Sequence, residues 1–273
     1  MNLLEVRNLH LTFYDTEPPL EVVRDISFSM KEGEILGLVG ESGSGKTQTA
    51  LSIPRLLKPH EEISKGEIFF EGKDLAEFSQ KEMEEIRGRE ISMVFQEPMT
   101  SLNPVLTVGR QVEESLRLHT SFTKEERKAR AMQMLQEVEL PEAEKLYHQY
   151  PHQLSGGMRQ RVMIASALVT EPKLLIADEP TTALDVTVQT QILKLLGKIN
   201  AKHRTGILFI SHDLSVVRRL CHRVIVMNQG KIEEMGAVEE IFKNPQKEYT
   251  KKLLEAVPTR GKSLRRRKGG GAQ

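Results

Sequence analysis

The chain has 273 residues, and its 39 Lys and Arg side chains nearly balance its 38 Asp and Glu side chains, giving a formal net charge of +1. This length suits one large domain or two small ones and is ample to bury a core. The hydrophobic content of 38% argues against disorder. Because the sequence has one cysteine, Cys221, and no apolar stretch near the roughly 18 residues of a membrane helix, disulfide-rich secreted and membrane-spanning classes are excluded.

The first third of the sequence predicts mainly strands. Apolar residues at near-alternate positions predict strands over residues 3–13 and 22–30. A short apolar run over 34–40 is typical of a buried parallel strand, and a helix is expected over 46–57. A further strand pair is expected from residue 66 to 75, followed by a short polar helix over 80–88 and a strand over 91–96.

The rest of the sequence predicts helices first and then an alternation of strands and helices. Helical spacing marks 107–119 and 123–140, where Thr123 and Glu126 form a capping box. A helix over 155–170 precedes an alternating series that ends in strands over 223–236; the series is strand 173–180, helix 185–203, strand 206–211 and helix 213–222. This alternation predicts an α/β fold with a parallel sheet, into which a helical subdomain of approximately 97–155 is inserted.

A glycine-rich segment with the pattern GxxxxGK[ST] joins the apolar run at 34–40 to the helix expected after it. Glycines allow backbone N–H groups to surround phosphate oxygens, and the positive end of the following helix points at the same oxygens. Lys46 supplies a charge for the β- and γ-phosphates, and the Thr47 hydroxyl can ligate Mg²⁺. The segment therefore predicts a phosphate site made by Gly40, Glu41, Ser42, Gly43, Ser44, Gly45, Lys46 and Thr47.

Two adjacent carboxylates, Asp178 and Glu179, end the apolar strand expected at 173–180. A carboxylate at the carboxyl end of a strand is placed to hold Mg²⁺, directly or through water, which we assign to Asp178. Glu179 can then polarise the attacking water as a general base. Paired with the phosphate segment, these residues predict hydrolysis of a nucleotide.

A second anion-binding helix terminus is expected where the helix over 155–170 begins. Ser155 can cap this helix, and Gly156 and Gly157 leave its N–H groups exposed. A chain that binds one ATP needs one phosphate cradle. The second cradle therefore indicates a site that is completed by another subunit.

These motifs together resemble the ATP-binding cassette (ABC) family, over approximately residues 1–255, with 256–273 as a basic tail. The resemblance implies a P-loop NTPase with a RecA-like parallel sheet core, an N-terminal antiparallel β subdomain and an inserted α-helical subdomain. It also implies ATP and Mg²⁺ as cofactors. In this family two copies close head to tail, so that each ATP lies between the phosphate loop of one copy and the residues equivalent to Ser155, Gly156 and Gly157 of the other.

The resemblance assigns further residues. Gln96 resembles the glutamine that reaches the metal and the attacking water and couples to the membrane partner. His212 resembles the switch histidine that contacts the γ-phosphate. The run from Thr182 to Asp185 resembles the loop that bridges the two subunits. Phe13 resembles the aromatic residue that stacks on adenine, with Tyr14 as the alternative. The implied catalytic residues are Glu179, His212, Gln96 and Lys46, and the implied metal ligands are Thr47, Gln96 and Asp178.

Finer resemblances point to the peptide and nickel importer branch of the family. They lie in the runs Phe95 to Pro104, Leu174 to Val188 and Asn244 to Thr250. Many peptide members of the branch carry a Cys-rich extension, whereas this sequence has only Cys221. Two cargoes therefore stay open, namely di- or oligopeptides and nickel or a metallophore. An ABC ATPase without a membrane partner is the less favoured alternative, because no long heptad run lies between Lys46 and Asp178.

The resemblance also implies the partners. They are a second ABC ATPase subunit, with a heterodimer favoured over a homodimer, two transmembrane permease subunits and, indirectly, a solute-binding protein, all at the cytoplasmic face of the cell membrane. No nucleic acid partner is expected. Residues 260–273 carry six basic side chains and no acidic one, so the remainder has a formal net charge of −5. The basic tail is expected to be solvated and disordered, with contact to anionic lipid headgroups as the alternative.

Overall fold

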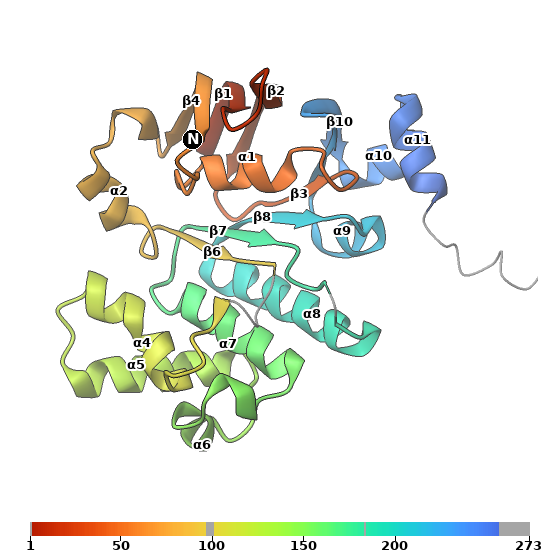
Figure 1. The fold of residues 1–273 in the computed structure, drawn as a ribbon. Helices are drawn as coiled ribbons and strands as arrows, with labels where there is room; N and C mark the ends of the chain where they lie inside the picture. The colour runs from red at the N-terminus through yellow and green to blue at the C-terminus, as the bar shows by residue number, and fades with distance from the viewer. Residues whose placement is uncertain (1, 97–100, 183, 257–273) are drawn as a thin grey trace, which may run out of the picture.

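The computed structural model describes residues 2–96, 101–182 and 184–256 (Figure 1). An antiparallel sheet lies at the top of the view, with the strand order β2-β1-β4-β5. Its strands are β1 (Asn2–Phe13), β2 (Leu20–Lys31), β4 (Glu61–Phe70) and β5 (Lys73–Asp74). The strand expected from residue 66 begins at Glu61 instead, because Glu61 and Ile63 pair across to Phe13 and Leu11 of β1. Pairing with a neighbouring strand, which local alternation does not report, sets this boundary.

A second sheet of six strands forms the centre of the molecule, in the order β10-β9-β3-β8-β7-β6. The prediction of a parallel sheet is confirmed, since only the edge strand β10 runs antiparallel to its neighbour. The carboxyl ends of β3, β6, β7 and β8 therefore meet at one edge. The strands are β3 (Ile35–Val39), β6 (Ile91–Val94), β7 (Leu174–Asp178), β8 (Gly206–Ser211), β9 (Arg223–Asn228) and β10 (Lys231–Ala237).

The parallel sheet is covered on both faces, as its unbroken apolar strands require. Successive side chains of a strand point to opposite faces, so Leu36 and Leu38 join the core under the antiparallel sheet while Ile35 and Val39 join the core on the other side. Helix α1 (Lys46–Ser52) packs into the first core. Helices α7 (Gly156–Leu168), α8 (Val186–His203) and α9 (Leu214–Leu220) pack into the second.

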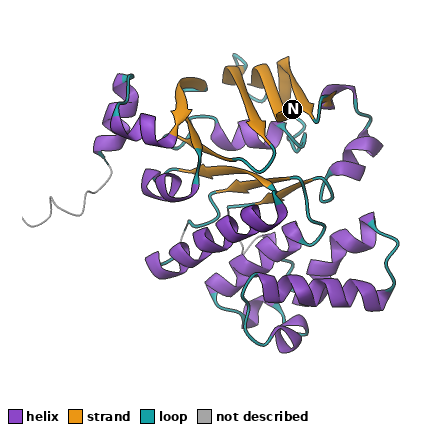
Figure 2. Cartoon of the chain, turned by 180° about the vertical axis from the view of Figure 1, so that it is seen from behind, coloured by secondary structure: helices purple, strands orange, loops and turns teal. Residues whose placement is uncertain are grey.

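The chain between β6 and β7 forms helices and no strand within the residues that the structure describes there, 101–173. These helices gather below the parallel sheet (Figures 1 and 2). The capping box predicted at Thr123 and Glu126 is confirmed at the start of α5. The elements are α4 (Val108–His119), α5 (Lys124–Glu137), α6 (Ala143–Tyr147), η2 (Pro151–Gln153) and α7.

A group of ion pairs joins the end of α5 to α8. Glu137 contacts Lys202 at 2.9 Å and His203 at 2.5 Å. Burial alone would raise the pKa of Glu137, but hydrogen bonds from these two partners outweigh burial and hold the pKa below its ordinary value. Because both elements also pack in the same core, this group fixes the helical segment against the sheet.

Two of the predicted helices end earlier than expected. The helix expected over 46–57 stops at Ser52, because Pro54 has no N–H group to donate and Arg55 adopts a left-handed φ of 53°. The helix expected over 213–222 stops at Leu220, and Cys221 is extended and buried beneath the sheet. The remaining short elements are η1 (Leu75–Glu77), α2 (Gln80–Ile86), α10 (Val238–Lys243) and α11 (Glu248–Glu255).

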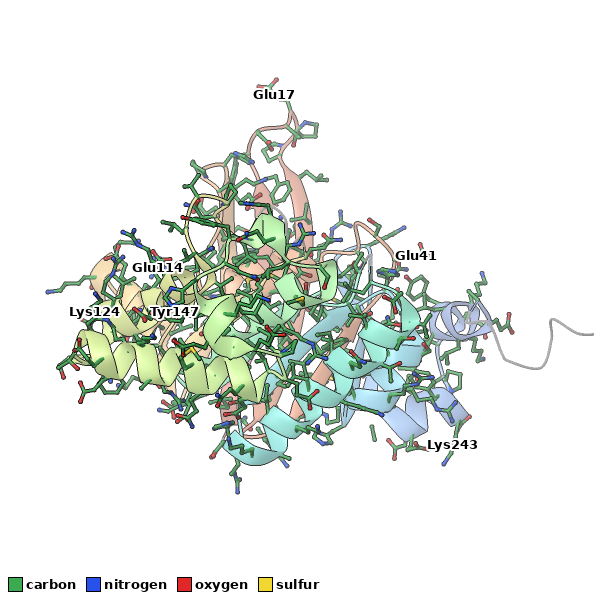
Figure 3. All side chains as sticks on the ribbon, turned by 90° about the horizontal axis from the view of Figure 1, so that it is seen from below. Glu17, Glu41, Glu114, Lys124, Tyr147 and Lys243 are labelled. Carbon is green, nitrogen blue, oxygen red and sulfur yellow. The ribbon has the colours of Figure 1, made fainter. Side chains whose placement is uncertain are left out.

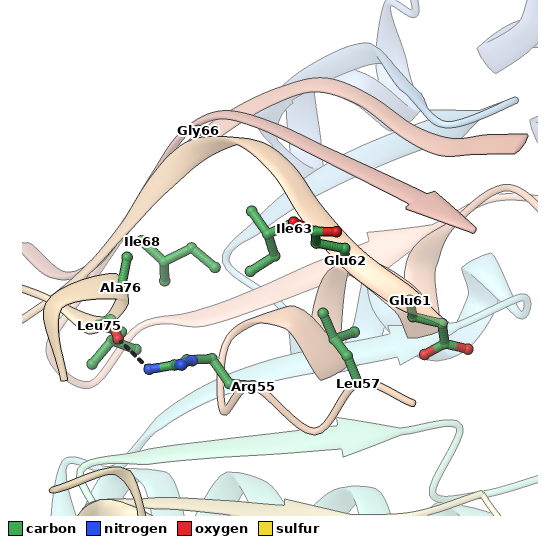
Figure 4. Close-up of a pocket in the computed structure, with 9 residues that line it drawn as sticks. All are labelled: Arg55, Leu57, Glu61, Glu62, Ile63, Gly66, Ile68, Leu75 and Ala76. Carbon is green, nitrogen blue, oxygen red and sulfur yellow. Dashed lines mark hydrogen bonds between the residues drawn. The ribbon is translucent and has the colours of Figure 1, made fainter. Parts of the chain in front are cut away.

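Arg55 lines a pocket of about 360 Å³ between β4 and the chain that follows α1 (Figure 4). Its guanidinium group donates to the carbonyl oxygens of Leu75 and Phe78, at 3.1 and 2.7 Å. These bonds tie the chain that follows α1 to η1 and its end, directly after β5 of the antiparallel sheet. None of the described helices is both long enough and apolar enough to cross a bilayer. The predicted basic tail lies outside the described residues from position 257 onward.

Candidate active site

The residues predicted to act on a nucleotide follow the carboxyl ends of four neighbouring parallel strands. The segment Gly40 to Thr47 follows β3, and Gln96 follows β6. Asp178 is the last residue of β7, directly before Glu179, and His212 follows β8. The sheet order therefore gathers segments that are far apart in the sequence into one site.

Lys46 is folded back onto its own loop. Its Nζ donates to the carbonyl oxygens of Gly40 and Glu41, at 3.0 and 2.8 Å, and to Oγ of Ser44 at 3.4 Å. Burial lowers the pKa of Lys46, and the carboxylates of Asp178 and Glu179 oppose this effect. A buried ammonium group surrounded by oxygen acceptors marks a place where phosphate oxygens would be bound.

Thr47 and Asp178 bring two oxygen ligands together. The Thr47 hydroxyl donates to Oδ1 of Asp178 at 3.2 Å. Asp178 is 4% exposed, and its burial raises the pKa of its carboxyl group despite the hydroxyl of Thr47 and the charge of Lys46. Hard oxygen ligands of this kind are those that Mg²⁺ prefers, so the pair fits a Mg²⁺ ion.

Three donors converge on one oxygen atom of Glu179. Its Oε2 contacts Nε2 of Gln96 at 3.2 Å, Oγ1 of Thr182 at 2.8 Å and Nδ1 of His212 at 3.0 Å. The backbone of Glu179 has a left-handed φ of 45°, which is unusual for a non-glycine residue, and its N–H group donates to the carbonyl of Ile210 in β8. The carboxylate is thus held in a defined position beside Asp178.

The structure places Ser155, Gly156 and Gly157 apart from this cluster. Ser155 caps α7 as predicted, through its hydroxyl and the N–H group of Met158. Within the described part of the chain, no hydrogen bond or ion pair joins these three residues to the phosphate loop or to Glu179. Asp185 caps α8 by accepting from two backbone N–H groups.

The two candidate adenine-stacking residues differ in exposure. Phe13 continues the inward face of β1, is partly buried and packs edge-on against His60 with 6.2 Å between ring centroids. Tyr14 is 52% exposed, and its N–H group donates to the carbonyl of His60. Both side chains therefore lie at the end of β1, and the packing of this strand does not favour one of them over the other as the residue that stacks on adenine.

Two contacts of the site were missed by sequence reasoning. Thr182 was assigned to the bridging loop by resemblance, whereas its hydroxyl contacts Glu179 only three positions earlier. Tyr249 contacts the backbone of Glu41 across 208 positions of sequence. The contact of Thr182 could have been predicted, because a hydroxyl three positions after a carboxylate in a turn can reach it. No local sequence pattern predicts the contact of Tyr249. Residues 97–100 and Ala183, which belong to the runs that carried the resemblance, lie outside the described residues.

A phosphate loop between a parallel strand and a helix, with a carboxylate pair ending a neighbouring strand, defines a P-loop nucleotide-binding protein. The sequence profile of the protein family described as "ABC transporter" matches residues 23–182 of this chain. The oligopeptide transport ATP-binding protein OppD of Bacillus subtilis is 51% identical over 258 residues, which are 94% of this chain and 72% of OppD. The chain therefore belongs to the ABC transporter family and is an ATPase.

Further comparisons agree with this family. The glutathione import ATP-binding protein GsiA of Escherichia coli is 49% identical over 266 residues, which cover 95% of this chain and 43% of GsiA. A dimeric structure of the ATP-binding cassette MJ0796 bound to ADP and Pi superposes with a TM-score of 0.77 at 32% identity, covering 86% of this chain and 98% of that one. The expected fold class is thereby confirmed.

Proposed function

We propose that this chain is the ATPase subunit of a bacterial importer of di- or oligopeptides, bound at the cytoplasmic face of the membrane. The observation that carries the proposal is the convergence of Gln96 and His212 on Glu179, beside Asp178 and the phosphate loop. The names of the relatives support a peptide cargo, since OppD is an oligopeptide transport protein and GsiA is a glutathione import protein. Both cargoes are peptides, which favours peptide over nickel or a metallophore.

Binding of ATP is assigned to the phosphate loop. Lys46 exchanges the carbonyl acceptors of its own loop for oxygens of the β- and γ-phosphates, so its charge is already in place. Thr47 and Asp178, with Gln96, would hold Mg²⁺, which when bound neutralises charge on the phosphate oxygens. Phe13 or Tyr14 would stack on the adenine.

Hydrolysis is assigned to Glu179. Its carboxylate orients and deprotonates the attacking water, and Gln96, Thr182 and His212 fix its position through one oxygen so that the other stays available. His212 is 59% exposed, which leaves it free to turn toward a γ-phosphate. These groups are preorganised before ATP arrives, which is the main requirement in phosphoryl transfer.

We further propose that Ser155, Gly156 and Gly157 serve the ATP of a second ATPase subunit. Two facts support this proposal: within the described residues these three make no bond to their own chain's site, and the related cassette MJ0796 has been solved as a dimer. The capped N-terminus of α7 would then contribute N–H donors to a phosphate across the interface. The start of α8 lies beside the start of α7, since a Cβ at Gly157 would come within 2.7 Å of Val188. Asp185, which caps α8, therefore lies close to the same N-terminus. A heterodimer is favoured over a homodimer.

A groove of about 280 Å³ between β6 and helices α4 and α7 suits a cytoplasmic helix of a permease subunit. Leu56 and Phe95 expose apolar surface at this groove, and the buried Ser92 hydroxyl on its wall has no hydrogen-bond partner among the described residues. Phe95 directly precedes Gln96, which contacts Glu179. A helix bound in the groove would contact Phe95 and would therefore influence Glu179 through the adjacent residue, Gln96.

The cargo is tested with the subunit assembled with its permeases and binding protein in liposomes that contain ATP. Uptake of a labelled oligopeptide is compared with uptake of a nickel chelate, in wild-type complexes and in complexes carrying Glu179→Gln. We expect peptide uptake that depends on ATP and is abolished by the substitution. Uptake of the nickel chelate alone would contradict the peptide assignment.

The permease groove is tested by Phe95→Asp, with Leu118→Asp on the exposed face of α4 as the matched control. The groove variant should lose the stimulation of ATP hydrolysis by the permeases while it retains the affinity for ATP, because the phosphate loop is untouched. The control should retain both. Equal stimulation of the two variants would remove the groove from the proposal.

A further inference from the structure

Helix α11 lies against the phosphate loop. The hydroxyl oxygen of Tyr249, in the first turn of α11, accepts a hydrogen bond from the backbone N–H group of Glu41 at 3.2 Å. In the view from below the sheet, Glu41 stands beside the blue ribbon of this helix (Figure 3). The contact joins two segments that are 208 positions apart in sequence.

The first turn of the phosphate loop has few other supports. The carbonyl oxygen of Glu41 accepts from Nζ of Lys46 at 2.8 Å and from the N–H group of Ser44 at 3.2 Å, and both bonds lie inside the loop. The base of the loop is fixed from outside, because the N–H group of Gly230 donates to the carbonyl of Ser44. For the exposed residues 41–43, the bond to Tyr249 is the one hydrogen bond from outside the loop among residues that the structure describes.

Tyr249 is itself held from two sides. The carboxylate of Glu234, on β10, accepts from the N–H groups of Gln246 at 2.8 Å and Lys247 at 3.2 Å, directly before α11. The ring of Tyr249 packs against the core together with Leu253 and Leu254 of the same helix. Burial raises the pKa of the Tyr249 hydroxyl, so the group stays neutral at all physiological pH values.

We propose that Tyr249 is a positioning residue of the phosphate loop, which couples α11 to the occupancy of the nucleotide site. The inference rests on the proposed function of that loop. A loop that is already held in its binding conformation loses less freedom when ATP binds, so removing the hydroxyl weakens binding. Coupling between two sites is reciprocal, and bound ATP therefore stabilises the docked position of α11 to the same extent.

The test is Tyr249→Phe, which removes the hydroxyl and keeps the ring. The matched control is Tyr147→Phe, which removes the hydroxyl that donates to Glu113 in the helical segment. We measure the dissociation constant for ATP with Mg²⁺ by calorimetry and the hydrogen exchange of residues 248–255 with and without ATP. From the usual net value of one hydrogen bond, Tyr249→Phe should raise the dissociation constant by roughly 3- to 10-fold.

In the wild type and in Tyr147→Phe, ATP should slow exchange in α11, whereas in Tyr249→Phe this protection should disappear. In the assembled importer, KM for ATP should rise with kcat unchanged, since Tyr249 does not contact Glu179. An unchanged dissociation constant, or protection that persists in Tyr249→Phe, overturns the proposal.

If Tyr249→Phe does not fold, Glu234→Ala takes its place, because it removes the hydrogen bonds that hold the start of α11 and leaves the tyrosine unchanged. The dissociation constant for ATP and the hydrogen exchange of α11 then test the proposal in the same way. The wild-type measurements separate this inference from the proposed function. A wild-type protein that binds no ATP contradicts the function of the loop itself, whereas normal binding with an unaffected Tyr249→Phe contradicts only the coupling.

Discussion

Two glycines of the phosphate loop should respond very differently to the same substitution. A Cβ at position 40 would lie 2.2 Å from the carbonyl oxygen of Met227 and 2.7 Å from Oγ of Ser44. The first of these atoms belongs to the backbone of β9, which is paired with β3 and cannot move without disturbing that pairing. A Cβ at position 43 would meet no atom within 4 Å, although Gly43 has a left-handed φ of 78°.

The overlap at Gly40→Ala is about 1 Å against backbone, and such overpacking costs about 3 kcal/mol. At Gly43→Ala the cost is that of a left-handed alanine, about 1 kcal/mol. For a chain of this size, these values correspond to losses in Tm of about 6–12 °C and about 2–4 °C. The assay is thermal unfolding followed by circular dichroism without nucleotide, with Gly43→Ala as the matched control. Equal losses, or a larger loss in Gly43→Ala, would refute the reasoning.

Three further substitutions test a buried carboxyl group of the site, an ion-paired carboxylate at the end of α5 and a glycine within α8. Asp178→Asn should raise Tm by a few degrees without nucleotide, because burial of the charged carboxylate destabilises the fold and raises the pKa of this group. This loss of stability is absent below the ordinary pKa of aspartate and complete above the raised pKa. The difference in Tm between the variant and the wild type at pH 7 should therefore shrink on acidification. Glu137→Gln should lower Tm by about 2–4 °C, because Lys202 and His203 hold the pKa of Glu137 low; this stability is present above the ordinary pKa of glutamate and is lost as the pH falls through the lowered value. Gly197→Ala should raise Tm by about 1–3 °C, because its Cβ would contact only a leucine methyl group at 3.7 Å and alanine favours the helix. Each is checked by thermal unfolding, and a shift of opposite sign would contradict the reason given.

Local patterns predicted the place of the phosphate loop between a strand and a helix, because the loop is one contiguous segment. Lys46 and Thr47 stand at fixed spacing from the glycines, and their setting between strand and helix is visible in the sequence. The capping box at Thr123 was predictable for the same reason. Element ends were less predictable, because Glu61 is placed in β4 by its partner strand.

Contacts between distant segments were not predictable from residue types. The order of the parallel sheet places β8 between β3, which is far from it in sequence, and β7. The pairing of β7 with β8 brings His212, which follows β8, to Glu179, which follows β7. Glu179 was predicted from its position at the end of an apolar strand and His212 through a family resemblance, but only the fold joins them. Tyr249 had no such signal, because an aromatic residue in an amphipathic helix ordinarily indicates core packing, and its ring does pack there.

The central claim is that Glu179 activates water for the hydrolysis of ATP, and Glu179→Gln tests it most directly. The substitution keeps the shape of the side chain and removes its basicity. We expect the rate of ATP hydrolysis by the assembled complex to fall by at least about 100-fold, the usual contribution of a general base. The affinity for ATP should be retained, and a closed ATP-bound dimer should accumulate on size-exclusion chromatography. Hydrolysis within a few-fold of the wild-type rate would contradict the account.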